Sequence, residues 1–282
     1  MPLVPMKEML QRARNEKYAV GAFEFWSLDS AQAVVESAAE LGLPAILQAG
    51  LLECEFAGGV KNLYRIAQMT ADAFPVPVAL HLDHAEDYDF VRSALDAGFT
   101  SVMIDASMMP FDENVRITQK VVEAAHPYGA SVEAELGKLA GSEGSLSVRE
   151  EEAAQTDPEE AQSFVEQTGV DALAVAIGTA HGFYTIAPKI NIERLREIAE
   201  KVAVPLVLHG GSGTPDDKVV EAIGYGIAKV NICTEFVAAF GTQYIQTQGQ
   251  PGYTYSIPSL FGPSKQAGKA LATAKMKLFG RK

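Results

Sequence analysis

One pattern recurs along the chain: an amphipathic helical stretch, then a glycine, then a short apolar run. It occurs as ELGLPAILQ, DAGFTSVMID, PYGASVEAEL, QTGVDALAVAIG and GYGIAKVNI. Glycine suits the left-handed position that ends a helix. The β-branched and aliphatic run that follows is typical of a strand buried on both faces. The repeat therefore predicts alternating helices and buried parallel strands.

Eight apolar runs of this kind can be counted, and the segments between them carry apolar residues at the helical spacing of three and four. Eight strands alternating with helices predict a TIM (β/α)8 barrel. An open, doubly wound sheet is the alternative, because one sequence does not show closure. No linker rich in proline, glycine or serine divides residues 1–282, so we expect one domain. The expected strands are Tyr18–Ala22, Pro44–Gln48, Pro77–Leu82, Ser101–Asp105, Ala130–Leu136, Ala172–Ile177, Pro205–Leu208 and Ala228–Ile232.

Two segments depart from the repeat. Residues 137–157 form a long insertion after the fifth strand, glycine-rich and then acidic. A long loop at the carboxyl end of a barrel strand is where an active-site lid would lie, although Arg149–Glu152 suit a plain surface loop. Residues 249–282 form a C-terminal extension, with a polar and aromatic loop (QGQPGYTYSIPSLFGP) and then a basic helix. We expect this additional helix to pack across the barrel or against another subunit.

Charge and cysteine content narrow the function classes. The net charge is −13 with no cluster of lysine and arginine, which makes nucleic acid an unsuitable partner. No stretch approaches the ~20 apolar residues that span a membrane, and the start lacks the pattern of a signal peptide. Cys54 and Cys233 form no CxxC pair, which favours two free thiols in a reducing compartment. These features predict a cytoplasmic protein.

Three of the five histidines lie at or just past the carboxyl ends of expected strands: His84, His181 and His209. In a barrel these strand ends open on one rim, so residues remote in sequence converge there. A lone histidine at such a place is more often structural. Three imidazoles that leave a fourth position open are the ligand set of a catalytic zinc.

Acidic residues are expected on the same rim. Asp83 precedes His84, Asp105 ends the fourth strand, and Glu133 and Glu135 share one face of the fifth. A buried carboxylate pair is costly unless it meets a cation. The alternative is a structural role in orienting metal ligands, which suits Glu133 better than Glu135.

Clusters of glycine and hydroxyl residues complete the rim: IGTAHG (177–182), HGGSG (209–213) and NICTE (231–235). The last two follow the seventh and eighth strands, where barrels commonly present backbone N–H groups and a helix N-terminus to phosphate. Glycines permit close backbone approach, while Ser212 and Thr234 add hydroxyl groups. We therefore expect a phosphate-bearing ligand.

Six motifs, HLDHAED, GFTSVMIDAS, SVEAELGKLAGSEG, DALAVAIGTAHGFY, PLVLHGGSGTP and KVNICTE, occur in order between residues 18 and 235. In these motifs the chain resembles the class II, metal-dependent ketose-bisphosphate aldolases, in the branch with the fructose and tagatose enzymes. The resemblance implies a lyase of carbohydrate metabolism, such as glycolysis. Such an enzyme reversibly cleaves a phosphorylated ketose to dihydroxyacetone phosphate and an aldehyde, through a zinc-stabilised enediolate.

The resemblance also implies roles for individual residues. His84, His181 and His209 would bind the catalytic zinc, and Asp83 would protonate the carbonyl oxygen of the aldehyde half. Glu143, in the insertion, would exchange the proton on the carbon next to the ketone. Asp105 and Glu135 match an alternative or second metal site, for a divalent or a monovalent cation. The residues implied to hold the phosphate and hydroxyls are Gly182, Gly210, Gly211, Ser212, Asn231, Ile232, Cys233 and Thr234. A homo-oligomer, dimer or tetramer, is also expected.

Three positions depart from the family pattern. Glu24 stands where an asparagine is usual, Gly50 lies near a usual hydroxyl residue, and Lys265 replaces an arginine that serves the distal phosphate. These changes concern the aldehyde end of the substrate. We expect Glu24 to face the rim and disfavour a distal phosphate, or else to pair with a lysine such as Lys265.

Other functions are compatible with the same motifs. The alternatives are a lyase or epimerase acting on another keto sugar with the same metal site, and a non-catalytic sugar-phosphate-binding protein. The retained Asp83 and Glu143 argue against the latter. A Schiff-base aldolase is disfavoured because the sixth strand has no lysine and because the neighbours of Lys229, on the eighth, suit a packed strand.

Overall fold

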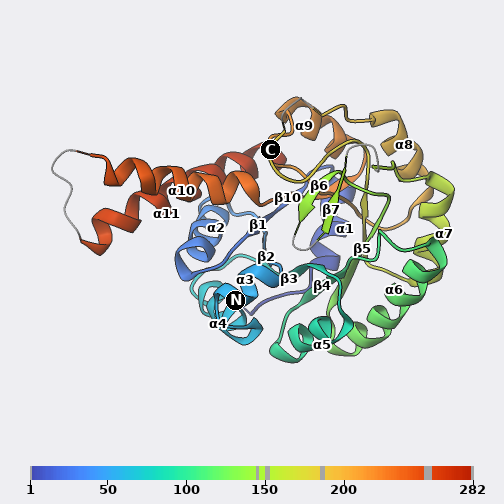
Figure 1. Ribbon diagram of the computed structural model, residues 1–282, viewed down its shortest axis with the longest axis horizontal. Coiled ribbons are helices and arrows are strands. Elements are labelled where there is room, and N and C mark those ends of the chain that lie inside the picture. The colour runs from blue at the N-terminus through green and yellow to red at the C-terminus, as the bar shows by residue number, and fades with distance from the viewer. Residues whose placement is uncertain (1, 144–145, 150–152, 185–187, 251–255, 281–282) are drawn as a thin grey trace.

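The computed structural model describes residues 2–143, 146–149, 153–184, 188–250 and 256–280. Eight parallel strands close into a barrel in the order β1-β10-β9-β8-β5-β4-β3-β2 (Figure 1). Closure confirms the TIM barrel and excludes the open sheet. The barrel strands are β1 (Val20–Glu24), β2 (Ala45–Ala49), β3 (Val78–Ala85), β4 (Ser101–Ile104), β5 (Ser131–Leu136), β8 (Ala172–Val175), β9 (Leu206–Leu208) and β10 (Ile227–Ile232).

Helices surround the barrel, and the glycines of the repeat end several of them. Gly42, Gly98, Gly129 and Gly169 each cap a helix in the left-handed conformation, as the pattern predicts. The helices are α1 (Met6–Glu16), α2 (Leu28–Leu41), α3 (Leu51–Phe56), α4 (Val60–Asp72), α5 (Tyr88–Ala97), α6 (Phe111–Ala125), η1 (His126–Tyr128), α7 (Pro158–Thr168), α8 (Ile192–Lys201), α9 (Asp216–Gly224), α10 (Thr234–Gln248) and α11 (Ile257–Phe279).

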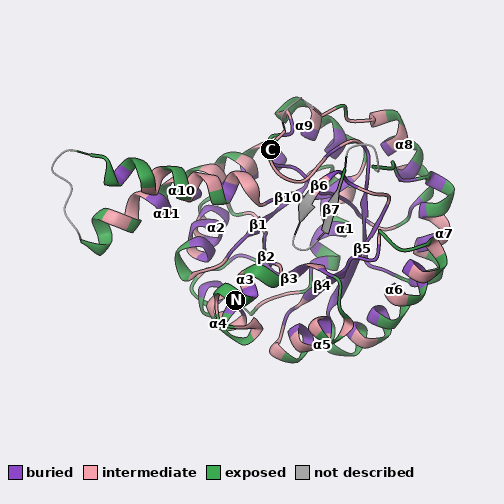
Figure 2. Ribbon diagram, in the orientation of Figure 1, coloured by how far each residue is buried: buried purple, intermediate pink, exposed green. Residues whose placement is uncertain are grey.

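Two hydrophobic clusters form the core. The larger fills the space between the strands and the surrounding helices, and the strands and inner helix faces are the most buried parts of the molecule (Figure 2). The smaller lies inside the barrel at the amino ends of the strands, where α1 contributes Met6 and Leu10, both fully buried. Helix α1 closes the interior of the barrel at this end, so the interior is approached from the carboxyl ends of the strands.

Two strands differ from their expected limits in a way that shapes the rim. Strand β1 begins at Val20 rather than Tyr18, because Lys17 caps α1 in the left-handed conformation, and it runs on to Glu24. Strand β3 continues to Ala85 through a register shift after Leu82, and His84 within this shift has φ +43°. Such a conformation is uncommon for a residue with a side chain and concentrates at functional sites.

The insertion at 137–157 contains an antiparallel hairpin of β6 (Gly141–Glu143) and β7 (Leu146–Val148). In Figure 1 this hairpin is drawn over the middle of the barrel. A bridge from Ala140 to Ala180 ties the base of the hairpin to the body, and a bridge from Lys138 to Ala154 joins the two ends of the insertion.

The C-terminal extension corrects one sequence expectation. The segment expected as a loop, SIPSLFGP, belongs mostly to α11, because Ser256 caps the helix by accepting from the Ser259 N–H and Pro258 suits the first turn. The C-terminal part of α11 packs against the barrel, where it contacts β1, α2 and α9 and buries Met276 and Phe279 in the core. Helix α11 pairs with α10 in a hairpin that projects from the barrel, and it also packs beside α2 (Figure 1). Among the described helices, none is both long and apolar enough to cross a membrane.

Candidate active site

The structure brings the three predicted histidines together at the carboxyl ends of the strands. His84 lies in β3, while His181 and His209 follow β8 and β9. Their ring centroids are 4.6, 5.0 and 5.9 Å apart, and one ring nitrogen from each lies within 4.8 Å of the others. Nε2 of His181 and Nδ1 of His209 are buried and have no hydrogen-bond partner among the described residues. Buried, unpartnered nitrogens pointing to a common centre fit a bound cation.

Neighbouring carboxylates orient the imidazole of His84 and favour its protonated form. Its Nδ1 lies 2.8 Å from Oδ2 of Asp105, and the other oxygen of that carboxylate, Oδ1, accepts from the Ser107 N–H. Burial alone would lower the pKa of His84, but Asp83 and Asp105 raise it to about 10. Burial likewise opposes ionisation of Asp105, yet His84 and Ser107 hold its pKa below the usual range. The pair therefore favours positive charge at His84.

His209 has two glutamates beside it. Its Nε2 lies 2.8 Å from Oε1 of Glu133, and its Nδ1 lies 3.1 Å from Oε2 of Glu135 without hydrogen-bond geometry. Burial and His84 lower the pKa of His209, but the glutamates outweigh them and raise it to about 9. Burial and the neighbouring histidines hold the pKa of His181 well below its usual value. The carboxylates thus favour positive charge at the histidine cluster, and a divalent cation would supply that charge in place of the imidazole protons.

Two further clusters could hold a cation. His84, Asp105 and Glu135 form one, as expected from the sequence, and His81, Asp83 and Glu133 form another beneath it. Burial, and then Asp105, raise the pKa of Glu135, although His209 and His84 act in the opposite direction.

Asp83 is held at the rim by amide donors. Its oxygens accept from Nδ2 of Asn231 at 3.1 and 3.3 Å and from Nε2 of Gln48 at 2.9 Å. Burial opposes ionisation, but His84, Lys229 and His81, whose Nε2 lies 3.3 Å from Oδ1, keep the pKa of Asp83 well below its usual value. Asp83 is thus an ionised, fixed carboxylate beside the histidine cluster.

The glycine and hydroxyl residues line one small cavity with Asp83, His84 and His181. Those that reach it are Gly182, Gly210, Ser212, Asn231, Cys233 and Thr234, together with Gln48. Gly211 and Ile232 do not line it: the Gly211 N–H donates to the Asn231 carbonyl, and the Ile232 side chain is buried in the core. Gly210 has φ +66°, and a Cβ there would lie 2.3 Å from the Ala180 carbonyl oxygen.

The hairpin of the insertion starts beside His181. The His181 N–H donates to the Ala140 carbonyl at 2.9 Å, and a Cβ on Gly141 would lie 2.4 Å from the His181 carbonyl oxygen. Only glycine permits this approach. Glu143 ends β6, but its side chain lies outside the described part of the structure, as do residues 150–152 of the expected surface loop.

Glu24 faces the rim, which was the first of the two arrangements expected for it from the sequence. It is 2% exposed and accepts from Nε2 of Gln48 at 3.2 Å and from the Gly50 N–H at 3.3 Å. Lys265 instead contacts Gln32 and Glu36 on α2, at 2.8 and 2.7 Å. The alternative pairing of Glu24 with Lys265 is therefore not the arrangement found.

Three polar residues of the site were given no role by the sequence reasoning, which considered Lys229 only as a Schiff-base lysine and set it aside. Gln48 links Glu24 to Asp83, and its only signal was a polar residue ending an apolar strand. Lys229 is fully buried, with Nζ 2.9 Å from Oε2 of Glu133. His81 lies beneath the rim, with Nδ1 2.8 Å from the Ser101 hydroxyl. Alternation along β10, which places Lys229 and Asn231 on one face, could have indicated an inward lysine.

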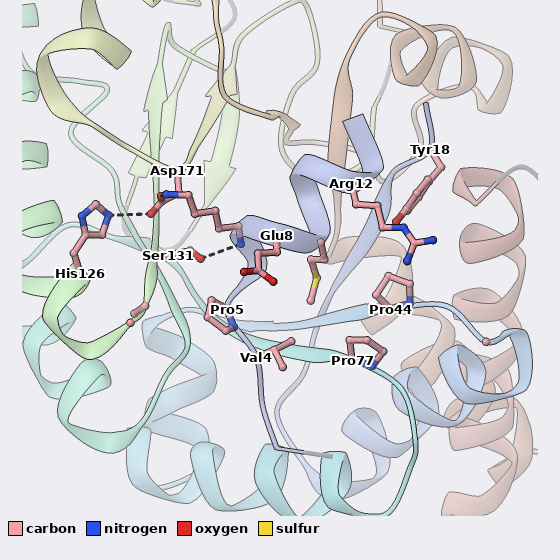
Figure 3. A pocket seen from close by; sticks show the side chains of 15 residues that line it. Val4, Pro5, Glu8, Arg12, Tyr18, Pro44, Pro77, His126, Ser131 and Asp171 are labelled. Carbon is pink, nitrogen blue, oxygen red and sulfur yellow. Dashed lines mark hydrogen bonds and ion pairs between the residues drawn. The ribbon is translucent and has the colours of Figure 1, made fainter. Parts of the chain in front are cut away.

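A larger cavity, of about 690 Å³, lies at the opposite end of the barrel beside α1 (Figure 3). Its buried carboxylate, Asp171, already contacts Lys7 at 2.8 Å and His126 at 3.1 Å and accepts from the Val132 N–H. These bonds attach α1 to the barrel, so we assign this end to stability.

The same architecture is found in proteins of known family. The profile of class II fructose-bisphosphate aldolases matches residues 4–282. The chain belongs to this family. It is 42% identical over 282 residues to a fructose-bisphosphate aldolase of Geobacillus stearothermophilus, covering 99% of this chain and 98% of that one.

Solved structures agree with this assignment. The crystal structure of the YdjI aldolase from Escherichia coli K12 superposes on the present structure with a TM-score of 0.86. The two sequences are 36% identical, and the match covers 99% of this chain and 97% of that one. The fructose-bisphosphate aldolase of Campylobacter jejuni, at 21% identity, shares the fold with a TM-score of 0.84, over 99% and 96% of the two chains. The protein is a class II aldolase, a lyase built on a TIM barrel.

Proposed function

We propose that this aldolase reversibly cleaves a phosphorylated ketose to dihydroxyacetone phosphate and an aldehyde. We also propose that His84, His181 and His209 hold the divalent cation, with zinc preferred by an all-nitrogen ligand set. The observation that carries the proposal is the histidine cluster, whose buried and unpartnered nitrogens adjoin the fixed carboxylate of Asp83. When bound, the cation would supply Lewis-acid stabilisation of the negative charge that develops on a neighbouring substrate oxygen.

The protein side chains would then move the protons. In cleavage, Asp83 accepts the proton of the hydroxyl group at the bond that breaks, and in the reverse direction it returns that proton to the aldehyde oxygen. Its bonds to Asn231 and Gln48 fix its direction. Glu143 adds and removes the proton on the carbon next to the ketone, and segment 137–157 acts as the lid that carries it.

The phosphate of the dihydroxyacetone phosphate half would bind at the glycine loops. Gly182, Gly210 and Ser212 line the small cavity beside the N-terminus of α10, where Cys233 and Thr234 lie. A helix N-terminus with flanking glycine loops favours an anion. We assign Gly211 the role of holding this loop to β10. Asp105 and Glu135 would bind a second cation, or would bind the first cation in an alternative position.

We propose a homo-oligomer, with the hairpin of α10 and α11 as the contact between subunits. The hairpin projects from the barrel (Figure 1) and exposes Ile245 by 71%, Ile257 by 76% and Phe261 by 45%. Large apolar side chains gathered on a projecting element are typical of a surface that another chain covers. We place this reaction in carbohydrate metabolism in the cytoplasm; in the described structure Cys54 and Cys233 form no disulfide, which suits a reducing compartment.

Solvent-proton exchange into dihydroxyacetone phosphate tests the function, because it needs the metal site and the lid but no aldehyde. We expect about one zinc per chain by elemental analysis, exchange that chelation abolishes, and exchange that zinc restores. His209→Ala should lose both zinc and exchange, whereas His126→Ala, which changes a histidine at the other end of the barrel, should keep both. Exchange at full rate in the chelated protein would contradict the proposal, and an epimerase would exchange protons without releasing an aldehyde from any ketose phosphate.

A further inference from the structure

A second cavity opens on the active site from the side of β1, β2 and β3. It has a volume of about 470 Å³ and shares Asp83 and His84 with the small cavity at the glycine loops. A substrate whose phosphate lies at the glycine loops and whose reacting atoms lie at Asp83 would extend its other half into this space. The lining of this cavity therefore selects the aldehyde.

The lining is acidic. It contains five carboxyl side chains, from Glu24, Glu53, Asp83, Glu86 and Asp87, and no lysine or arginine. The undescribed segments of the chain before residue 281 contain no lysine or arginine either. The one imidazole in the lining, that of His84, is bonded to Asp105. Among the described residues that line this cavity, an anionic group would therefore meet carboxylates and no lysine or arginine, and His84 belongs to the metal cluster.

Glu24 is built into the cavity rather than placed loosely at its edge. It is 2% exposed and accepts from the Gly50 N–H and from Nε2 of Gln48. The same Gln48 nitrogen donates to Asp83, so the carboxylates of Glu24 and Asp83 are held by one amide. Oε1 of Gln48 is buried and has no hydrogen-bond partner among the described residues. A buried acceptor left open between two fixed carboxylates is suited to a ligand that donates hydrogen bonds.

Building on the function proposed above, we propose that the aldehyde half of the substrate is uncharged and hydroxylated, and that Glu24 is the residue that rejects a phosphorylated aldehyde. The ketose would then carry its single phosphate at the dihydroxyacetone end. Hydroxyl groups in this cavity donate to Glu24, and those nearer the reacting atoms donate to Gln48 Oε1, which borders the small cavity. A distal phosphate is instead repelled by a buried carboxylate that bulk water does not screen.

The test compares two acceptors that differ only in the phosphate. The zinc-loaded aldolase is given dihydroxyacetone phosphate with D-glyceraldehyde or with D-glyceraldehyde 3-phosphate, and kcat/KM is measured for each. We expect wild type to favour the uncharged aldehyde by at least about 10-fold. Glu24→Gln keeps the size of the side chain and an oxygen for the Gly50 N–H, and should shift the ratio toward the phosphorylated aldehyde by about 10-fold or more. Glu55→Gln removes an exposed charge of α3 outside the cavity and should leave the ratio unchanged.

Each outcome decides the matter. A wild-type preference for the phosphorylated aldehyde, or a ratio that Glu24→Gln leaves unmoved, overturns the inference. Proton exchange into dihydroxyacetone phosphate shows that each variant is folded and competent. If wild type exchanges protons but adds neither aldehyde, the inference fails while the metal and lid assignments stand. If exchange is absent as well, the proposed function fails and the inference with it.

Discussion

Replacing Lys229 by methionine should destabilise the aldolase strongly, because this lysine is the cation beneath the rim. Its Nζ lies 2.9 Å from Oε2 of Glu133 and 3.9 Å from Oδ1 of Asp83, and the lysine and glutamate side chains are fully buried. Methionine fills a similar volume without the charge. The change therefore isolates the electrostatic contribution and leaves the buried carboxylate of Glu133 with His209 but without its lysine partner.

The magnitude follows from these distances. With an effective dielectric constant of about 20, attraction at 2.9 Å amounts to roughly 6 kcal/mol. The cost of removing the lysine from water offsets part of this gain. Breaking a buried pair by deleting one partner typically costs about 3 to 5 kcal/mol, because the remaining charge is stranded. For a chain of this size that loss lowers Tm by roughly 5 to 8 °C.

Urea unfolding and thermal melting of the zinc-loaded protein measure the effect. Lys218→Met is the matched control: Lys218 is exposed and pairs with Glu221 on the same helix, so its loss should cost less than about 1 kcal/mol. Adding Glu133→Gln to Lys229→Met removes the stranded charge and should recover part of the stability. A loss below about 1 kcal/mol for Lys229→Met, or no recovery in the double variant, would refute the reasoning.

Three further outcomes are expected. Asp83→Ala should stop carbon–carbon cleavage yet keep proton exchange into dihydroxyacetone phosphate. Glu143→Ala should instead slow that exchange by ~10² to 10⁴-fold. The reverse pattern would contradict the assignment of the two residues. Leu10→Ala should cost about 2 to 5 kcal/mol in urea unfolding with kcat nearly unchanged, because Leu10 is fully buried at the end of the barrel away from the site; a large loss of kcat in the folded variant would speak against this. Burial, and then Glu53 and Glu24, raise the pKa of the Cys54 thiol to about 12, so iodoacetamide at pH 8 should spare Cys54 in the folded protein and label it after unfolding in urea. Equal labelling in both states would exclude a buried thiol.

The sequence by itself determined the strands, the helix ends and the histidine cluster. The strands are short apolar runs, and glycines such as Gly42 and Gly98 end helices because they adopt the left-handed conformation without strain. These features depend on neighbours a few residues away. Once the barrel was expected, a histidine at a strand's carboxyl end had to lie on the rim, because all parallel strands of a barrel end there.

Only the tertiary structure decided how the polar side chains pair. Gln48 joins Glu24 to Asp83, which lies 35 residues further along the chain, and Lys229 meets Glu133 from 96 residues away. The placement of α11 beside α2 could likewise not be predicted from the sequence. Each of these contacts requires particular strands or helices to lie side by side, and the direction of the side chains follows from barrel closure and register. A polar residue in an apolar strand shows that a partner must exist, because burial without one is costly, but only the folded chain places that partner in contact with it.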